Sequence, residues 1–158
     1  MYSCILNNMY SSEALVSMAD GSFKNINNIK VGDAIYNKFM KPVSVSRVHS
    51  SANAPVVEVQ FNNGTGIFYA IPASQVFVHH AQTDKSHNLQ YDTISNARTE
   101  GARLKSTMKF LSPQSDVSFT TYNDSDTTLT KTVYCLHTLD GSKTYFVNKT
   151  IVCCCSEN

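Results

Sequence analysis

The sequence has few charged residues. They make up 16% of its 158 positions, whereas an average soluble domain has about 25%. The charges also nearly cancel, since 13 Lys and Arg stand against 12 Asp and Glu and leave a formal net charge of +1. We therefore expect no basic surface of the kind that binds nucleic acid or acidic lipid. Uncharged polar residues, chiefly Asn, Ser and Thr, take the place of the missing charges.

Long apolar segments are missing as well. No run approaches the roughly 18 residues of a membrane-spanning helix, and the start, residues 1–8, lacks the basic and apolar regions of a signal peptide. We therefore expect no membrane partner and a cytoplasmic location. Hydrophobic residues at 42%, with 8 Tyr and 8 Phe, are sufficient for one core, so a single domain over residues 1–158 is predicted.

The cysteines do not have the spacing of a disulfide framework or of a zinc site. There are five, and no C-x-x-C pair occurs among them: Cys4, Cys135, Cys153, Cys154 and Cys155. Without a signal peptide we expect most of them to be thiols, and Cys135 to have a structural role only. A disulfide or a zinc site that joins the last three cysteines to Cys4 is the weaker alternative. No metal and no cofactor is predicted.

The chain is instead rich in short β-branched and aromatic segments that are interrupted by turn residues about every ten positions. This pattern is typical of an all-β barrel or sandwich. Two hairpins are predicted, one over residues 56–71 around Asn63-Gly64 and one over residues 133–147 around Asp140-Gly141. The polar stretches 79–93 and 112–130 are predicted to be loops.

Two landmarks recur in the same order and indicate an internal repeat. In the two predicted hairpins, Gly64 corresponds to Gly141, and Val59 corresponds to Leu136. Before each hairpin, at a similar distance, stands a second pair of matching segments, residues 31–35 and 100–104. Two copies of one β unit within a single chain predict a pseudo-symmetric all-β domain.

Four ordered blocks of the sequence carry further motifs: Ala14–Asp33, Ile71–Val78, Ala97–Leu104 and Tyr145–Val152. In this order they resemble the hedgehog/intein (Hint) family. The first block is similar to the family's valine strand, D-G turn and I-x-x-I-x-x-G-D, and the second to T-P-x-H followed by an apolar strand. The third is similar to A-x-x-x-x-G-x-x-L with one residue fewer, and the fourth to Y-F-V-N-G-x-x-V. The resemblance implies an all-β, pseudo-two-fold Hint horseshoe.

The resemblance also implies a reaction, autocatalytic cleavage of a peptide bond by an N-to-S acyl shift. In the family a cysteine thiolate attacks the carbonyl of its own preceding residue and forms a thioester, which a second nucleophile resolves. Such a reaction needs a thiol that can lose its proton, a histidine that protonates the leaving nitrogen, and donors for the oxyanion.

This chain departs from the family at every one of those positions. The family spacing places Met9 where the nucleophilic cysteine belongs, and a thioether cannot be deprotonated to attack. Ile71 and Ser74 stand at the positions of the assisting threonine and histidine. Cys153 and Cys154 replace the terminal His-Asn pair of inteins, so that asparagine cyclisation is lost. We therefore expect a degenerate copy, retained as a scaffold or as a module that binds a protein partner.

The alternative is an active self-cleaving or splicing domain that acts on its own chain. Cys4 would then be the nucleophile, if Asn7 and Asn8 are an insertion in the first turn. Even a correctly placed Cys4 would lack a histidine at the matched position, so we expect slow cleavage at most.

Overall fold

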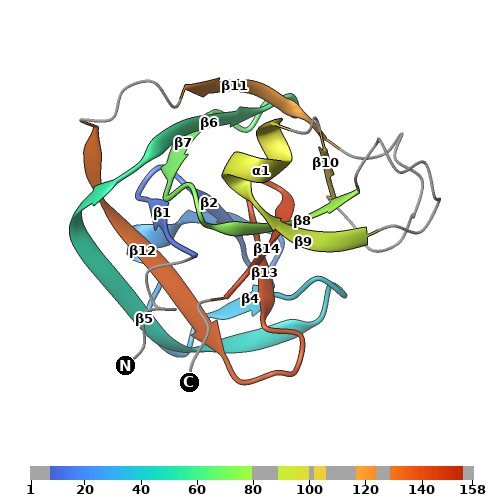
Figure 1. Cartoon of the computed structure of the whole chain (residues 1–158). Coiled ribbons are helices and arrows are strands. Elements are labelled where there is room, and N and C mark those ends of the chain that lie inside the picture. Colours follow the sequence, from blue (N-terminus) through green and yellow to red (C-terminus); the bar gives the residue numbers. More distant parts are fainter. Residues whose placement is uncertain (1–7, 80–88, 100–101, 106–116, 124–128, 155–158) are drawn as a thin grey trace.

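The computed structural model describes residues 8–79, 89–99, 102–105, 117–123 and 129–154. Figure 1 shows a β structure of curled sheets. Helix in the described part is limited to the 3-10 turn η2 (Ile26–Asn28) and the short α1 (Ile94–Thr99). The strands are β1 (Tyr10–Ser11), β2 (Leu15–Ser17), β3 (Phe23–Asn25), β4 (Ala34–Tyr36), β5 (Pro42–Pro55), β6 (Val57–Phe61), β7 (Ile67–Ala70), β8 (Gln75–His79), β9 (Leu89–Thr93), β10 (Arg103–Leu104), β11 (Phe119–Asn123), β12 (Thr130–Thr138), β13 (Thr144–Val147) and β14 (Thr150–Cys153).

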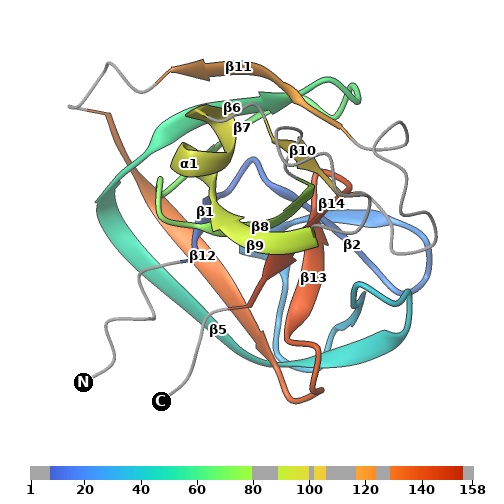
Figure 2. The ribbon, with the colours of Figure 1, turned by 45° about the vertical axis from the view of Figure 1, so that its right-hand side comes forward.

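The strands form two sheets. The first has the order β11-β6-β7-β1-β12-β5-β4, and the second has the order β10-β8-β14-β13-β2-β3, with β9 paired to β8. The long strands β5 and β12 pair antiparallel and run side by side along one flank of the molecule (Figure 2). No helix in the described ranges is long and apolar enough to cross a membrane.

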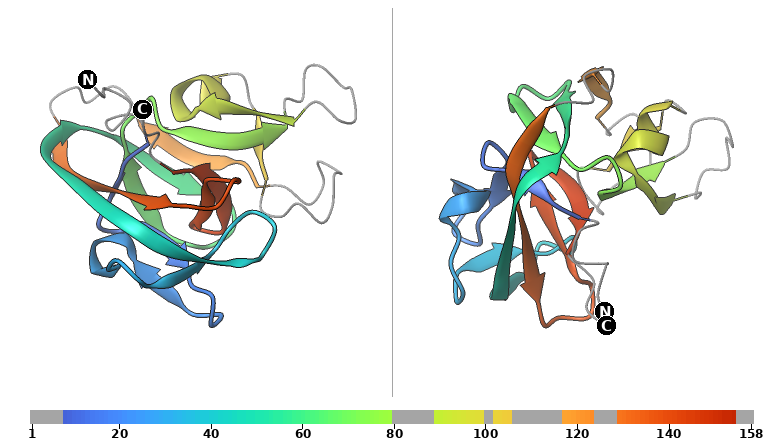
Figure 3. Two further views of the ribbon diagram at one scale, coloured as in Figure 1. Left: turned by 90° about the horizontal axis from the view of Figure 1, so that it is seen from below. Right: turned by 60° about the vertical axis from the view of Figure 1, so that its left-hand side comes forward.

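The strand order shows the predicted pseudo-two-fold symmetry. In the first sheet β11-β6-β7 mirrors β5-β12-β1, and in the second sheet β9-β8-β14 mirrors β3-β2-β13. The axis therefore passes between β7 and β1 and between β14 and β13. The two equivalent units, β2 with β3 and β8 with β9, lie at opposite ends of the molecule (Figure 3).

Individual contacts repeat along with the strands. The bridge between Met18 and Ile35 corresponds to the pairing of Val78 with Leu104. This confirms the predicted match between residues 31–35 and 100–104 at its last position. Because Ile35 and Leu104 are both fully buried, the matching apolar positions of the sequence reflect matching places in the core.

The second predicted hairpin, over residues 133–147, does not form. β12 pairs with β1 and β5, whereas β13 pairs with β14 and β2 in the other sheet. The chain does turn at Asp140-Gly141, but the turn carries it from one sheet to the other. The match of Val59 with Leu136 is retained, because β6 and β12 are equivalent strands, but β7 is equivalent to β1 and not to β13.

The other strand predictions were partly right. The hairpin of β6 with β7 forms as predicted, with Gly64 at a φ of +78° in its turn. The two polar stretches are not wholly loops, because β9 lies within 79–93 and β11 within 112–130. Their polar residues fit edge positions, since within the described residues β11 pairs with β6 alone and β9 with β8 alone.

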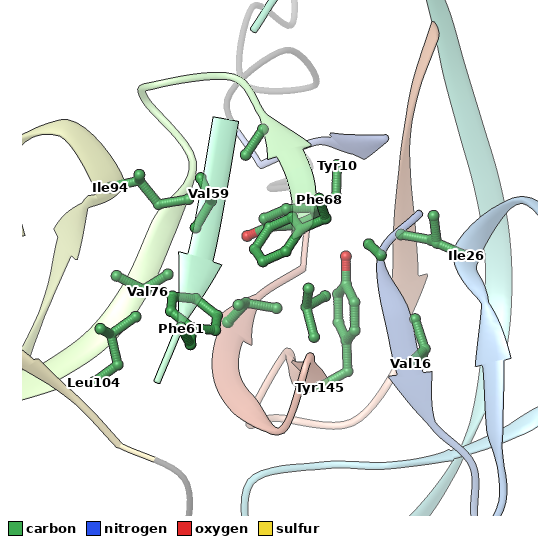
Figure 4. Packing of buried hydrophobic residues seen from close by; sticks show 14 of the residues in the cluster. Tyr10, Val16, Ile26, Val59, Phe61, Phe68, Val76, Ile94, Leu104 and Tyr145 are labelled. Carbon is green, nitrogen blue, oxygen red and sulfur yellow. The ribbon is translucent and has the colours of Figure 1, made fainter. Parts of the chain in front are cut away.

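The core lies between the two sheets and is rich in aromatic rings. Figure 4 shows Tyr10, Phe61, Phe68 and Tyr145 packed with aliphatic side chains from both sheets. The rings of Phe61 and Phe68 meet edge to face with their centroids 5.5 Å apart. Truncating one such ring to alanine costs about 3–5 kcal/mol in a typical core. This packing fixes the start of β1, and with it the candidate site.

Candidate functional site

Met9, Ile71 and Ser74 lie together, although they are far apart in the sequence. Met9 precedes β1, and the other two residues form the turn between β7 and β8. The amide N of Ser74 donates to the carbonyl of Ile71 at 2.9 Å, which closes this turn, and the amide N of Ile71 donates to the carbonyl of Met9 at 3.2 Å. The side chains of Ile71 and Met9 also share one apolar cluster.

The Ser74 hydroxyl hydrogen-bonds both the amide nitrogen and the carbonyl oxygen of Met9. The amide N of Met9 donates to Ser74 Oγ at 3.0 Å, and Ser74 Oγ donates to the Met9 carbonyl at 3.1 Å. Both residues are fully buried. The Asn8–Met9 peptide nitrogen is therefore bound by the side chain of Ser74. A serine hydroxyl can orient this nitrogen, but it does not exchange protons near neutral pH as an imidazole does.

Asn8 joins the two ends of the described chain. Its Nδ2 donates to the carbonyl of Cys154 at 2.9 Å, and its Oδ1 accepts from the amide N of Gln75 at 2.7 Å. The residue that precedes Met9 is thus bonded to the end of β14. The peptide bond before Met9 and the last described residues of the chain belong to one site.

Cys153 and Cys154 face different surroundings, as consecutive residues of a strand do. Burial raises the pKa of the Cys153 thiol to about 12, with the nearby Cys154 adding to the shift. Burial likewise raises the pKa of Cys154 to about 11. Cys154 Sγ lies 3.5 Å from Thr138 Oγ1, which donates to Asp140 Oδ1 at 2.6 Å. Both thiols are protonated at neutral pH, and both are free cysteines.

Two buried phenols lie near the same cysteines. Tyr10 and Tyr145 are fully buried, and burial raises the pKa of each well above 10. The nearby Cys153 raises that of Tyr10 further. Neither hydroxyl has a hydrogen-bond partner within the described residues, although the Ser74 side chain lowers the pKa of Tyr10 and the Leu136 backbone lowers that of Tyr145. The site therefore contains two phenol hydroxyls that are protonated at neutral pH.

Cys135 is the residue that sequence reasoning missed. Because Tyr10 pairs with Tyr134 in the antiparallel ladder of β1 and β12, Met9 lies opposite Cys135, and both side chains belong to the same buried cluster. Cys135 is disulfide-bonded. The prediction of a purely structural thiol is therefore wrong. No sequence pattern marks this contact, because it depends on the register of two distant strands.

Some predicted residues cannot be placed. Cys4 and Cys155 lie outside the described residues. Across the described ranges, no group of three or more His, Cys, Asp and Glu side chains could hold a metal ion. A surface cavity of about 420 Å³ is lined by the β2–β3 turn and the start of β4, and none of the site residues named above contributes to it.

Comparison with solved structures identifies the fold. The MchDnaB-1 intein superposes with a TM-score of 0.67 at 16% identity, covering 91% of this chain and 98% of its own. A DnaB intein from Synechocystis sp. PCC 6803 gives a TM-score of 0.65 at 17% identity, with coverages of 92% and 97%. A bacterial intein-like domain from Clostridium thermocellum gives 0.69 at 14% identity, with the same coverages.

These likenesses show that the chain has the intein/Hint fold, over nearly its whole length and that of the compared domains. No protein-family model matches the sequence. No curated protein matches it significantly either.

Proposed function

We propose that this chain is a Hint-type autoprocessing domain in which attack by residue 9 has been lost, and that it now acts as a scaffold or binding module for a protein partner. The observation that carries the proposal is the hydrogen bonding of Met9 by Ser74, which accepts from the nitrogen of the Asn8–Met9 peptide at 3.0 Å and donates to the Met9 carbonyl at 3.1 Å. The place of a scissile bond is kept, while the groups that would break it are absent.

Each missing group has a physical consequence. The Met9 sulfur already carries a methyl group, so it cannot become a thiolate. Ser74 in place of histidine removes a proton donor, which is typically worth about 10²- to 10⁴-fold in rate. Cys154 in place of asparagine removes the side-chain amide that would cyclise. What remains is a fold whose two ends are tied by the bond from Asn8 to Cys154.

One observation favours the second candidate, an active self-cleaving domain. Cys135 lies across the ladder from Met9, so reduction of the disulfide would give a free thiol in the same buried cluster as the Met9 side chain. Cys4, which the sequence points to as the nucleophile, would act at the Ser3–Cys4 bond instead. The two routes therefore differ in the bond that breaks.

A folded tag fused before Met1 tests the proposal. After overnight incubation at neutral pH, with and without dithiothreitol and hydroxylamine, mass spectrometry should find the tag still attached. Release at Asn8–Met9 that is abolished by Cys135→Ala, or release at Ser3–Cys4 that is abolished by Cys4→Ala, would overturn the degenerate function. The variant that blocks release would then identify the nucleophile.

A further inference from the structure

The loop that joins β4 to β5, residues 37–41, connects the two sheets. β4 and β5 both belong to the first sheet. The loop is nevertheless bonded to the second sheet, because the amide N of Lys38 donates to Oγ1 of Thr144 in β13 at 3.0 Å. It is also bonded to the turn after β12, because Nδ2 of Asn37 donates to Oδ2 of Asp140 at 3.1 Å. Residues 37–41 therefore form a strap between the sheets.

The Lys38 side chain ends in a cage of aromatic rings. Its Nζ lies 5.1 Å from the ring centroid of Phe77 in β8 and 5.4 Å from that of Tyr91 in β9. The ring of the neighbouring Phe39 is 5.3 Å away. Nζ also donates to Tyr91 Oη at 3.0 Å. Because an ammonium ion is attracted to the faces of aromatic rings, these contacts hold the strap against β8 and β9.

The strap lies on the face of the second sheet that carries the Cys153 thiol. Thr144 pairs directly with Cys153 in the ladder of β13 and β14, so their side chains lie side by side on one face. The Lys38 backbone is bonded to this Thr144 side chain. Burial raises the pKa of Cys153 most, and the nearby charge of Lys38 acts in the opposite direction. Tyr36, the residue before the strap, packs on the apolar cluster of β8, β13 and β14.

The turn of the strap is strained. Met40 has a left-handed φ of +60°, which is unfavourable for a residue with a side chain. Within the turn, Oδ1 of Asn37 accepts from the amide N of Phe39 at 2.9 Å and from that of Lys41 at 3.1 Å. Strain of this kind persists only where surrounding contacts hold it. The contacts of Lys38 with the second sheet are among those that do so.

We propose that the strap is a latch over the Cys153 thiol, closed by the Lys38 ammonium in its aromatic cage. When Lys38 leaves the cage, the strap lifts from β13 and β14 and the thiol meets solvent. In the closed state burial keeps the thiol protonated at neutral pH, and a protonated thiol is a poor nucleophile. The rate at which an electrophile alkylates Cys153 therefore reports how often the latch opens.

The experiment measures that rate in the folded full chain. The protein is incubated with iodoacetamide at neutral pH, and tandem mass spectrometry of timed samples locates the label on each cysteine. Lys38→Met removes the charge and keeps a long side chain. It should speed the labelling of Cys153 by about 5- to 30-fold, the factor that corresponds to a partly desolvated cation–π contact.

Two controls separate the latch from general loosening. Lys41 is an exposed lysine of the same strap, so Lys41→Met should leave the rate at Cys153 unchanged. Cys154 belongs to the main core, so its slow labelling should not change in Lys38→Met. If Cys154 and Cys153 accelerated together, the substitution would act by unfolding the chain, and the inference would be overturned.

Tyr91→Leu opens the latch from the other side, because it removes both a ring and the hydroxyl that Lys38 binds. It should also accelerate labelling of Cys153. The double variant should be no faster than the faster single variant, since both substitutions remove one shared interaction. Circular dichroism confirms that each variant is folded. A folded Lys38→Met protein that labels Cys153 at the wild-type rate would overturn the inference, and so would independent, multiplying effects of the two substitutions.

The inference goes beyond the proposed function and does not rest on it. Neither Met9 nor Ser74 takes part in the latch, and the label on Cys153 is read without any cleavage of the chain. Release of a tag before Met1 would therefore contradict the proposed function and leave the latch standing.

Discussion

At the scale of single residues, the turn between β13 and β14 contains a strained position. Asn148 and Lys149 both adopt left-handed backbone conformations, with φ of +49° and +65°. Two hydrogen bonds offset the backbone strain at Asn148. Its Oδ1 accepts from the amide N of Leu15, and its Nδ2 donates to the Thr65 carbonyl. Lys149 stands where the resembling family has glycine, and its Nζ lies 5.5 Å from the centroid of the exposed Phe23 ring.

Replacing Lys149 with glycine should therefore stabilise the protein. The left-handed conformation costs a residue with a side chain about 1–2 kcal/mol, which glycine does not lose. Glycine has more conformational freedom in the unfolded chain, and this cancels about 0.5–1 kcal/mol of the stabilisation. We expect Lys149→Gly to raise the free energy of unfolding by about 0.5–1 kcal/mol, measured by urea denaturation.

Lys149→Ala is the matched control. It removes the contact with Phe23 but keeps the side-chain strain, so it should leave stability unchanged or lower it slightly. If Lys149→Ala stabilised as much as Lys149→Gly, the backbone strain would not be the cause.

The clustering of Met9, Ile71 and Ser74 could be predicted from the sequence. The contact of Cys135 with Met9 could not. The three residues stand at fixed spacings from recognisable blocks, so their family positions implied that they cluster. That a thioether, an aliphatic side chain and a hydroxyl cannot act as thiolate or as imidazole follows from their chemistry alone. The contact of Cys135 with Met9 needs the register of β1 on β12, and register arises from the packing of the whole core. Neither the spacing of the cysteines nor the composition around them carries that information.

At the scale of elements, the connection between β12 and β13 shows that a turn can form as predicted although the strands on either side of it do not pair. Asp140 makes the expected local turn, accepting from the Ser142 amide and from Thr138 Oγ1. The same local chemistry serves a tight hairpin and a crossing between sheets, because it fixes only a few backbone angles. Which strands then pair depends on distant segments, here β1 and β14. For this reason the first predicted hairpin was right and the second was wrong.

Asp140 should make stability depend on pH. Although burial alone would raise its pKa, hydrogen bonds from Ser142, Thr138 and Asn37 hold it below the ordinary 3.8. A carboxyl with a lowered folded-state pKa stabilises the fold above its unfolded pKa, and this contribution is lost as pH falls through the folded value. Stability should therefore decline below about pH 4. Asp140→Asn should lower it by about 1–3 kcal/mol at neutral pH and flatten that decline.

Leu139→Asn provides the control for this corner. Leu139 is 87% exposed, so its replacement should change neither the free energy of unfolding nor its pH dependence by a measurable amount. Urea denaturation at several pH values between about 3 and 7 compares the two variants with the wild type. An Asp140→Asn protein with the full wild-type pH dependence would show that other carboxyls are responsible.

At the scale of the whole molecule, the pseudo-two-fold arrangement explains how the site is assembled. The axis passes between β7 and β1, so the turn after β7 and the entry to β1 meet near it, and with them Ser74 and Met9. Sequence indicated the symmetry, because two landmarks recurred in order. It did not show that Asn8 bonds to the carbonyl of Cys154.

The most direct test restores the two missing groups. Met9→Cys with Ser74→His should cleave at Asn8–Met9 in the presence of a thiol, and faster than Met9→Cys alone by about 10²-fold or more. Met9→Ala with Ser74→His should remain intact. A mass-spectrometric time course follows the released residues, and circular dichroism confirms folding. Under the proposed function we expect cleavage to return, because the two substitutions would supply a nucleophile and a proton donor at hydrogen-bonded positions. A folded Met9→Cys, Ser74→His protein that stays whole would contradict it.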